Sequence, residues 1–196
     1  MTIPLLSLLI GIPLVASLLL ASGKFNTYAK SISIGTSILQ VIVLVKIYLD
    51  FQVENSAIQL EEQHAWIQFS LGSLGQFVSH FHLGLDGLSL GLVLLTGVIS
   101  LLAIWNSDGI KERKSTYYAL VLLLNASIIG CFLSRDLLLF YVFFEFMLLP
   151  MYFLIGIWGG PRKDYASIKF FLYTLVGSLF ILIVFLALGI SYVDPY

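Results

Sequence analysis

One glutamate, Glu145, stands inside an apolar run long enough to cross a membrane, Leu137–Trp158. In a helix rising about 1.5 Å per residue, its carboxyl lies within roughly 5 Å of the bilayer midplane. An ionised carboxylate there costs roughly 2.5–3.5 kcal/mol, so Glu145 should face protein or water and be protonated or paired. A group poised between those states can carry protons. The alternative is a protonated glutamate that only bonds a neighbouring helix.

Two tyrosines share the expected helical face of Glu145. Tyr141 precedes it by four residues and Tyr152 follows it by seven, and both spacings return to one side of a helix. Pro150 has no N–H, so the carbonyl of Phe146 loses its usual helical donor and can bind water or a side chain. The pattern predicts a polar, hydrated face around the carboxyl, with both tyrosines as supporting groups.

Asn125 and Lys169 are further polar residues within apolar runs. Asn125 lies at the centre of Tyr117–Leu133, where it serves either helix packing or a proton relay. Lys169 shares a helical face with Tyr173, four residues further on. It lies about 14 Å from Glu145 along the membrane normal, which excludes a direct pair. Lys169 is therefore either an anchor that reaches the interface or part of a water-linked proton path.

Asp86 begins another apolar run, in the stretch GLDGLSL. Its position near an interface favours a helix N-cap over a role in proton transfer. The long loop before it, residues 50–82, alternates aromatic residues with Gly and Ser, which indicates either a short hairpin or an interfacial segment. Its three histidines have no Cys or carboxylate at matching spacing, so a metal site is not expected there.

The elements that must position these residues are membrane-spanning helices. The chain of 196 residues is 59% hydrophobic and only 11% charged, which is typical of a membrane protein. Runs of about 20 apolar residues span a bilayer as helices. The sequence therefore predicts an all-α polytopic membrane protein with about six transmembrane helices, the first of them retained rather than cleaved as a signal peptide. The six runs are Ile3–Ala21, Ala29–Leu49, Leu83–Trp105, Tyr117–Leu133, Leu137–Trp158 and Ile168–Tyr192.

Loop charges predict the orientation of these helices. Seven of the ten basic residues lie in the loops of one side, where Lys and Arg mark the cytoplasm or matrix. The N-terminus should therefore face the opposite compartment. This divides the chain into two N-terminal helices (1–49), an extracytoplasmic loop (50–82) and four further helices (83–196). The seven residues are Lys24, Lys30, Lys111, Arg113, Lys114, Arg162 and Lys163.

Several function classes are excluded by what the sequence lacks. A net charge of −1 without a basic patch gives no reason to expect a nucleic-acid partner. A single cysteine, Cys131, cannot form an iron–sulfur ligand set, and no nucleotide-binding glycine motif is present. The chain is therefore expected to hold no redox centre or other cofactor. Buried titratable groups without a driving cofactor are typical of the ion-translocating part of a larger complex.

Three stretches carry a resemblance to a known family. FHLGLDGLSLGLVLLTGVISLLAIW, FYVFFEFMLLPMYFLIGIWGG and IKFFLYTLVGS follow one another from about residue 81 to residue 178. Together they resemble the antiporter-like chain 4 (subunit M) family of proton-pumping NADH:quinone oxidoreductase, respiratory complex I, in its bacterial form. Related chains occur in multisubunit cation/proton antiporters and membrane-bound hydrogenases. The motifs GLDGLS and FFEFMLLPMY are more similar to the complex I branch.

The resemblance implies a mechanism and a set of partners. Glu145 would be a principal proton-pathway residue, with Lys169 near the conduit. The partners would be other membrane-arm subunits, especially neighbouring antiporter-like ones, and the lipid of a bacterial inner membrane, with a mitochondrial inner membrane the less favoured alternative. NADH, FMN, iron–sulfur clusters and quinone would be bound by the partner subunits.

The length of the chain departs from the family pattern. Family members have about fourteen helices, and their fifth-helix glutamate is partnered by a lysine on the seventh. This sequence stops at Tyr196, after the sixth run. We therefore expect this chain to be either the N-terminal part of a longer protein or one product of a split gene, and we favour the first. The functional alternatives are a subunit of a cation/proton antiporter or membrane-bound hydrogenase, and a truncated piece without transport activity.

Overall fold

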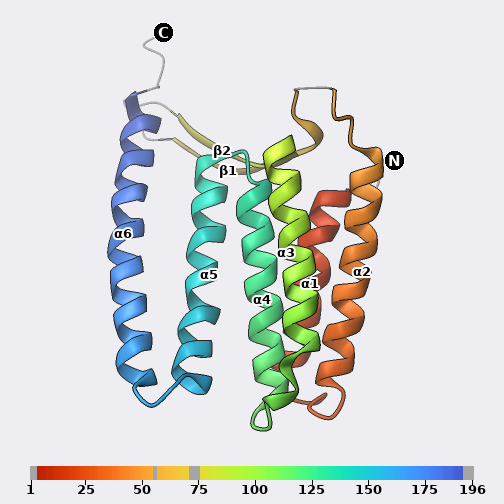
Figure 1. The fold of residues 1–196 in the computed structure, drawn as a ribbon. Helices are drawn as coiled ribbons and strands as arrows, with labels where there is room; N and C mark the ends of the chain where they lie inside the picture. Colours follow the sequence, from red (N-terminus) through yellow and green to blue (C-terminus); the bar gives the residue numbers. More distant parts are fainter. Residues whose placement is uncertain (1–3, 55–56, 71–75, 192–196) are drawn as a thin grey trace.

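The computed structural model describes residues 4–54, 57–70 and 76–191, and it is helical apart from one hairpin (Figure 1). Helices form in all six predicted runs, which confirms a polytopic helical protein. Five helices are long and apolar enough to span a membrane, and α1, with 17 residues, is shorter. The helices are α1 (Leu5–Ala21), α2 (Ala29–Asp50), α3 (Gly87–Trp105), α4 (Lys114–Leu133), α5 (Leu137–Trp158) and α6 (Lys163–Ser191).

Three helix starts differ from the sequence-based boundaries. Residues Leu83–Leu85 end a strand, so α3 begins only at Gly87, directly after its cap. By contrast α4 begins at Lys114 and α6 at Lys163, several residues before their apolar runs. Charged residues start both helices, which is why hydropathy alone places these starts too late.

The long loop forms an antiparallel hairpin of β1 (Gln59–Ser70) and β2 (Gln76–Leu85), which confirms the hairpin interpretation. It lies across one end of the bundle and extends over α5 toward α6 (Figure 1). We call this the hairpin end. Within the hairpin, His82 contacts Glu61 at 3.2 Å, and no group of three potential metal ligands is found among the described residues.

Three carboxylates cap the helices that begin at the hairpin end. Asp86 accepts the Ser89 N–H at the start of α3, and Asp136 accepts the N–H groups of Leu138 and Leu139 at the start of α5. The cap of α1 comes from far away in sequence, because Glu62 of β1 accepts the backbone N–H of Leu6 at 2.7 Å and that of Ser7 at 2.9 Å. Negative charge at these helix starts also interacts favourably with the positive ends of the helix dipoles.

Asp136 additionally joins the hairpin to the bundle. Its carboxylate accepts the Ser79 hydroxyl at 2.9 Å and the His80 N–H at 3.3 Å, both from β2. Next to it, the Arg135 N–H donates to the His82 carbonyl at 2.9 Å. The short turn between α4 and α5 is thus fixed to the strand that crosses above it.

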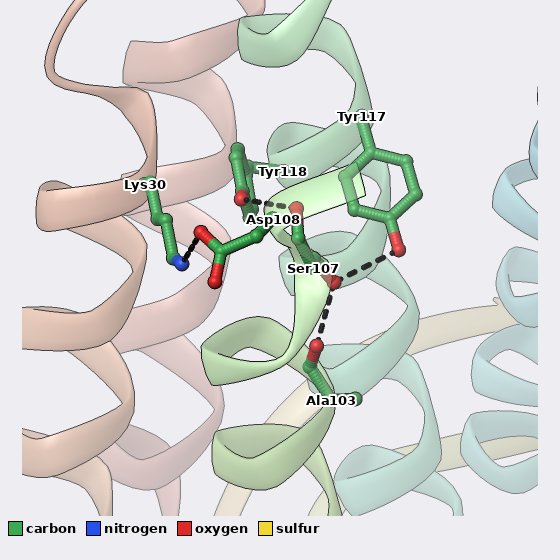
Figure 2. Close-up of polar contacts among 6 residues, drawn as sticks. All are labelled: Lys30, Ala103, Ser107, Asp108, Tyr117 and Tyr118. Carbon is green, nitrogen blue, oxygen red and sulfur yellow. Dashed lines mark hydrogen bonds and ion pairs between the residues drawn. The ribbon is translucent and has the colours of Figure 1, made fainter. Parts of the chain in front are cut away.

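The opposite end of the bundle, here called the basic end, carries the seven basic loop residues identified from the sequence (Figure 1). Lys30 of α2 forms an ion pair with Asp108 of η2 (Ser107–Gly109) (Figure 2). The Tyr118 hydroxyl donates to the Ser107 carbonyl at 3.2 Å, and the Ser107 hydroxyl lies 3.2 Å from the Tyr117 hydroxyl. Figure 2 shows how these contacts tie the α3–α4 connection to both α2 and α4.

Close approach of α4 and α5 depends on Gly130. A Cβ atom added to Gly130 would lie 2.3–2.5 Å from three ring atoms of Phe143, including Cγ, so the ring could not simply turn away. The absence of a side chain lets α5 pack tightly against the buried face of α4. Gly35 of α2, by comparison, has open space around its Cα.

We predict that Gly130→Ala lowers the stability of the bundle, whereas Gly35→Ala does not. Overpacking against Phe143 should cost about 1–3 kcal/mol, while alanine at Gly35 should be neutral or gain up to about 1 kcal/mol of helix propensity. Thermal unfolding of the detergent-solubilised protein measures both effects. Equal unfolding midpoints for the two variants would contradict the close α4–α5 contact.

Candidate functional site

Glu145 lies halfway along α5, on the side that faces α6. It is partly buried, and its Oε1 atom is fully buried without a hydrogen-bond partner among the described residues. No ion pair of the described residues includes it. A buried carboxyl oxygen without a partner is costly unless a proton or a water molecule satisfies it. The site therefore has the chemical character of a proton acceptor.

Tyr141 and Ser178 complete the polar surroundings of Glu145. The Tyr141 hydroxyl lies within interaction range of both the Glu145 carboxyl and the Ser178 hydroxyl. Ser178 belongs to α6, is only 1% exposed, and donates to the Leu175 carbonyl at 2.9 Å. Tyr141 thus lies beside Glu145, as its spacing predicts, whereas Ser178 was missed. Its only sequence signal is that it repeats the helical face of Ser167 after eleven residues.

Tyr152 lies on the same side of α5 but nearer the basic end. Its ring is 5.4 Å from that of Phe171 in α6, between ring centroids. It also lines a cavity between the two helices together with Asp164 and Ser167. α5 continues without interruption through Pro150. Tyr141 and Tyr152 therefore both lie on the side of α5 that contacts α6.

Asn125 is not part of this site. It is 1% exposed, and its amide donates to Gln40 Oε1 of α2 at 2.6 Å. Gln40 in turn donates to the Leu9 carbonyl of α1 at 3.2 Å. This chain of contacts joins α4, α2 and α1 and has the form of helix-packing hydrogen bonds. The Asn125 Oδ1 atom is buried without a partner.

Lys169 lies on the side of α6 that is turned away from α5. Its Nζ atom is 5.6 Å from the ring centroids of both Tyr165 and Tyr173, at cation–π distance. These tyrosines are 64% and 72% exposed, whereas Ser167 and Ser178, on the α5-facing side, are 2% and 1% exposed. The predicted face shared with Tyr173 is present. The structure does not bring Lys169 together with Glu145.

Asp86 is a helix cap and an ion-pair partner at the hairpin end. Besides accepting the Ser89 N–H, it lies 3.0 Å from Nη2 of Arg135. The Ser89 N–H is the main reason that the pKa of Asp86 is lowered to about 2, and Arg135 lowers it further against the opposing effect of burial. The structure thus agrees with the N-cap interpretation, while the contact with Arg135 was not predicted.

Comparisons with known proteins agree with this arrangement. Residues 134–192, which include α5 and α6, match the family described as NADH:quinone oxidoreductase/Mrp antiporter, TM. NADH-quinone oxidoreductase subunit M of Rickettsia typhi is 35% identical over 190 residues, which cover 92% of this chain. Chloroplastic NAD(P)H-quinone oxidoreductase chain 4 of Hordeum vulgare is 38% identical over 190 residues and 95% of this chain.

The chain resembles the antiporter-like subunits named subunit M or chain 4. It is also similar to a chain of respiratory complex I from Thermus thermophilus with bound NADH, with a TM-score of 0.68, 28% identity and 89% of this chain covered. The resemblance inferred from the sequence is therefore confirmed. The matched part is 37% of each of the two relatives and 33% of the Thermus chain, so this chain spans only about a third of their length.

We predict that Asp86→Asn removes the ion pair with Arg135 but keeps the cap, because Asn caps helices about as well as Asp. A lowered pKa means that the ionised form stabilises the fold. That contribution is fully present above the usual pKa of 3.8 and is lost as the pH falls through about 2. The native chain should therefore be more stable than Asp86→Asn at neutral pH, and the difference should narrow between about pH 4 and pH 2.

Thermal unfolding across that pH range measures the difference. Asp86→Ala serves as the reference for loss of the cap. Its free energy of unfolding should be lower than that of Asp86→Asn by about 0.5–2 kcal/mol at every pH. A pH-independent difference between the native chain and Asp86→Asn would contradict the ion pair.

Proposed function

We propose that this chain is a membrane-arm subunit of an NADH:quinone oxidoreductase and contributes to proton translocation coupled to electron transfer. The supporting observation is the Glu145 carboxyl, whose Oε1 atom is buried without a hydrogen-bond partner among the described residues and which lies beside Tyr141. It also lies within the segment that matches the NADH:quinone oxidoreductase/Mrp antiporter family.

The proposed chemistry is a change of protonation at Glu145. In this proposal the carboxyl carries a proton while no cation is near it. A positive charge brought near it favours ionisation, and the proton leaves. Alternation between these two conditions moves one proton per cycle. In the complete protein, a lysine contributed by a later helix supplies that charge, as the family resemblance implies.

The redox chemistry belongs to partner subunits in this proposal. NADH, FMN, the iron–sulfur clusters and quinone are bound there, and this chain contacts neighbouring antiporter-like subunits and lipid. The basic end faces the cytoplasm and the hairpin end faces the opposite compartment, in agreement with the positive-inside rule. The membrane is the bacterial inner membrane.

We predict that Glu145→Gln in the complete complex lowers NADH-driven proton pumping about a hundredfold, because glutamine cannot accept or release the proton. Proton uptake into inverted membrane vesicles, normalised to assembled complex, measures this. Glu54→Gln removes an exposed glutamate near the hairpin end and is the matched control, with pumping expected to stay normal. Near-normal pumping by an assembled Glu145→Gln complex would rule out the proposed role of this residue.

A cation/proton antiporter is the second candidate, because the matched family description also names the Mrp antiporter. The two candidates differ in their energy source. Proton movement that requires NADH and quinone supports the first, whereas sodium-dependent proton exchange without NADH supports the second.

A further inference from the structure

An apolar groove of about 520 Å³ runs between α1 and α2. Leu8 and Leu19 lie at its two ends on α1, and Ile32 and Leu39 lie at its two ends on α2. Its volume is within the range of about 300–1,000 Å³ that is usual for small-molecule pockets. Leu19 and Leu39 are 52% and 49% exposed. The groove therefore opens to the surroundings of the bundle and not to its core.

Two glycines leave the space that forms the groove. Gly11 of α1 and Gly35 of α2 both line it, and a Cβ atom added at either position would meet nothing within 4 Å. At this depth α1 is held to α4, because the buried Ser17 hydroxyl donates to the Ala119 carbonyl at 2.7 Å. The gap on the α2 side of α1 is consequently part of the packed bundle.

The length of the groove matches one leaflet of a bilayer. Its ends are eleven residues apart on α1, or about 16 Å, and seven residues apart on α2, or about 10 Å. Next to the end nearer the hairpin, Gln40 of α2 donates to the Leu9 carbonyl of α1 at 3.2 Å and joins the two helices. One leaflet contributes about 15 Å of hydrocarbon, whereas a partner helix that crosses the membrane needs about 30 Å. An acyl chain therefore fits this groove better than a partner helix does.

A cation lies beyond the end of the groove at the basic end. Lys24 is exposed in the connection between α1 and α2, five residues after Leu19. No ion pair of the described residues includes Lys24, whereas Lys30 is paired with Asp108. Tyr28 of the same connection is 66% exposed, and tyrosine favours the membrane interface. A cation and an aromatic ring at the end of a leaflet-length apolar groove suit the phosphate and the acyl chain of one anionic lipid.

We propose that the α1–α2 groove binds one acyl chain of an anionic phospholipid from the leaflet at the basic end, with the lipid phosphate at Lys24. Apolar contact alone does not select this lipid, because the surrounding acyl chains are as apolar as the groove. Selection of the headgroup depends on the charge of Lys24, and space for the chain depends on Gly11 and Gly35. The bound chain fills the gap between α1 and α2. This lipid site is independent of Glu145.

Photolabelling of the complete complex in proteoliposomes tests the proposal. The probe is a phosphatidylglycerol with a photoactivatable diazirine at the end of one acyl chain, and mass spectrometry identifies the labelled peptides. We expect label around Leu8 and Leu39, at the end of the groove farther from Lys24. A second probe with the diazirine next to the ester group should instead label residues around Leu19 and Ile32.

A pair of leucine variants tests the groove itself. Gly35→Leu fills the groove and should lower the labelling about tenfold, because the chain would overlap the new side chain. Gly91→Leu adds the same side chain to an exposed glycine of α3 that has nothing within 4 Å and does not line the groove. Labelling of the groove in Gly91→Leu should equal that of the native chain.

A pair of charge variants tests the headgroup site. Lys24→Gln should lower the preference for the phosphatidylglycerol probe over a phosphatidylcholine probe about fivefold, since it removes one cation near the surface. Arg162→Gln removes an exposed cation at the same end, in the connection between α5 and α6, and should leave that preference unchanged.

Three results would overturn the proposal. The first is equal labelling of the groove in the native chain and Gly35→Leu, and the second is an equal headgroup preference in the native chain and Lys24→Gln. The third is labelling of the groove no stronger than that of the exposed α3 face around Leu95 and Ile99. None of these measurements depends on pumping. Normal pumping by Glu145→Gln would remove the proposed function and leave the lipid site unaffected.

Discussion

Capping of helix starts by carboxylates is the constraint on which the arrangement of this protein depends. Helices α1, α3 and α5 all begin at the hairpin end, and each presents unpaired N–H groups there. Glu62, Asp86 and Asp136 satisfy those groups. Since Asp136 also binds β2, the same carboxylate fixes both the start of α5 and the position of the hairpin above it.

The depth of Glu145 follows from that cap. Glu145 is nine residues beyond Asp136, which places it about 14 Å from the start of α5. The side of α5 that contacts α4 is held by the close approach at Gly130, so the helix cannot rotate freely about its axis. The face with Tyr141 and Glu145 is consequently presented to α6, where Ser178 lies.

The sequence was sufficient for the features that depend on local pattern. Apolar length located six helices, and the residue types at Asp86 predicted its cap. Contacts between distant segments were not predictable in this way. Nothing around Glu62 indicates that it caps a helix 56 residues earlier, because that contact exists only after the hairpin folds over the bundle. Ser178 likewise gains its role only when α6 packs against α5.

Lys169 shows how a correct local pattern can leave function open. Its spacing to Tyr173 correctly predicted a shared face, but spacing alone does not say which way that face points. The packing of Ser167 and Ser178 against α5 turns Lys169 outward, away from the carboxyl. Within the described residues Glu145 therefore has no cation beside it. A buried carboxyl in this condition responds strongly to any positive charge that approaches, because little else offsets it. The proposed coupling of a distant event to the movement of a proton rests on that sensitivity.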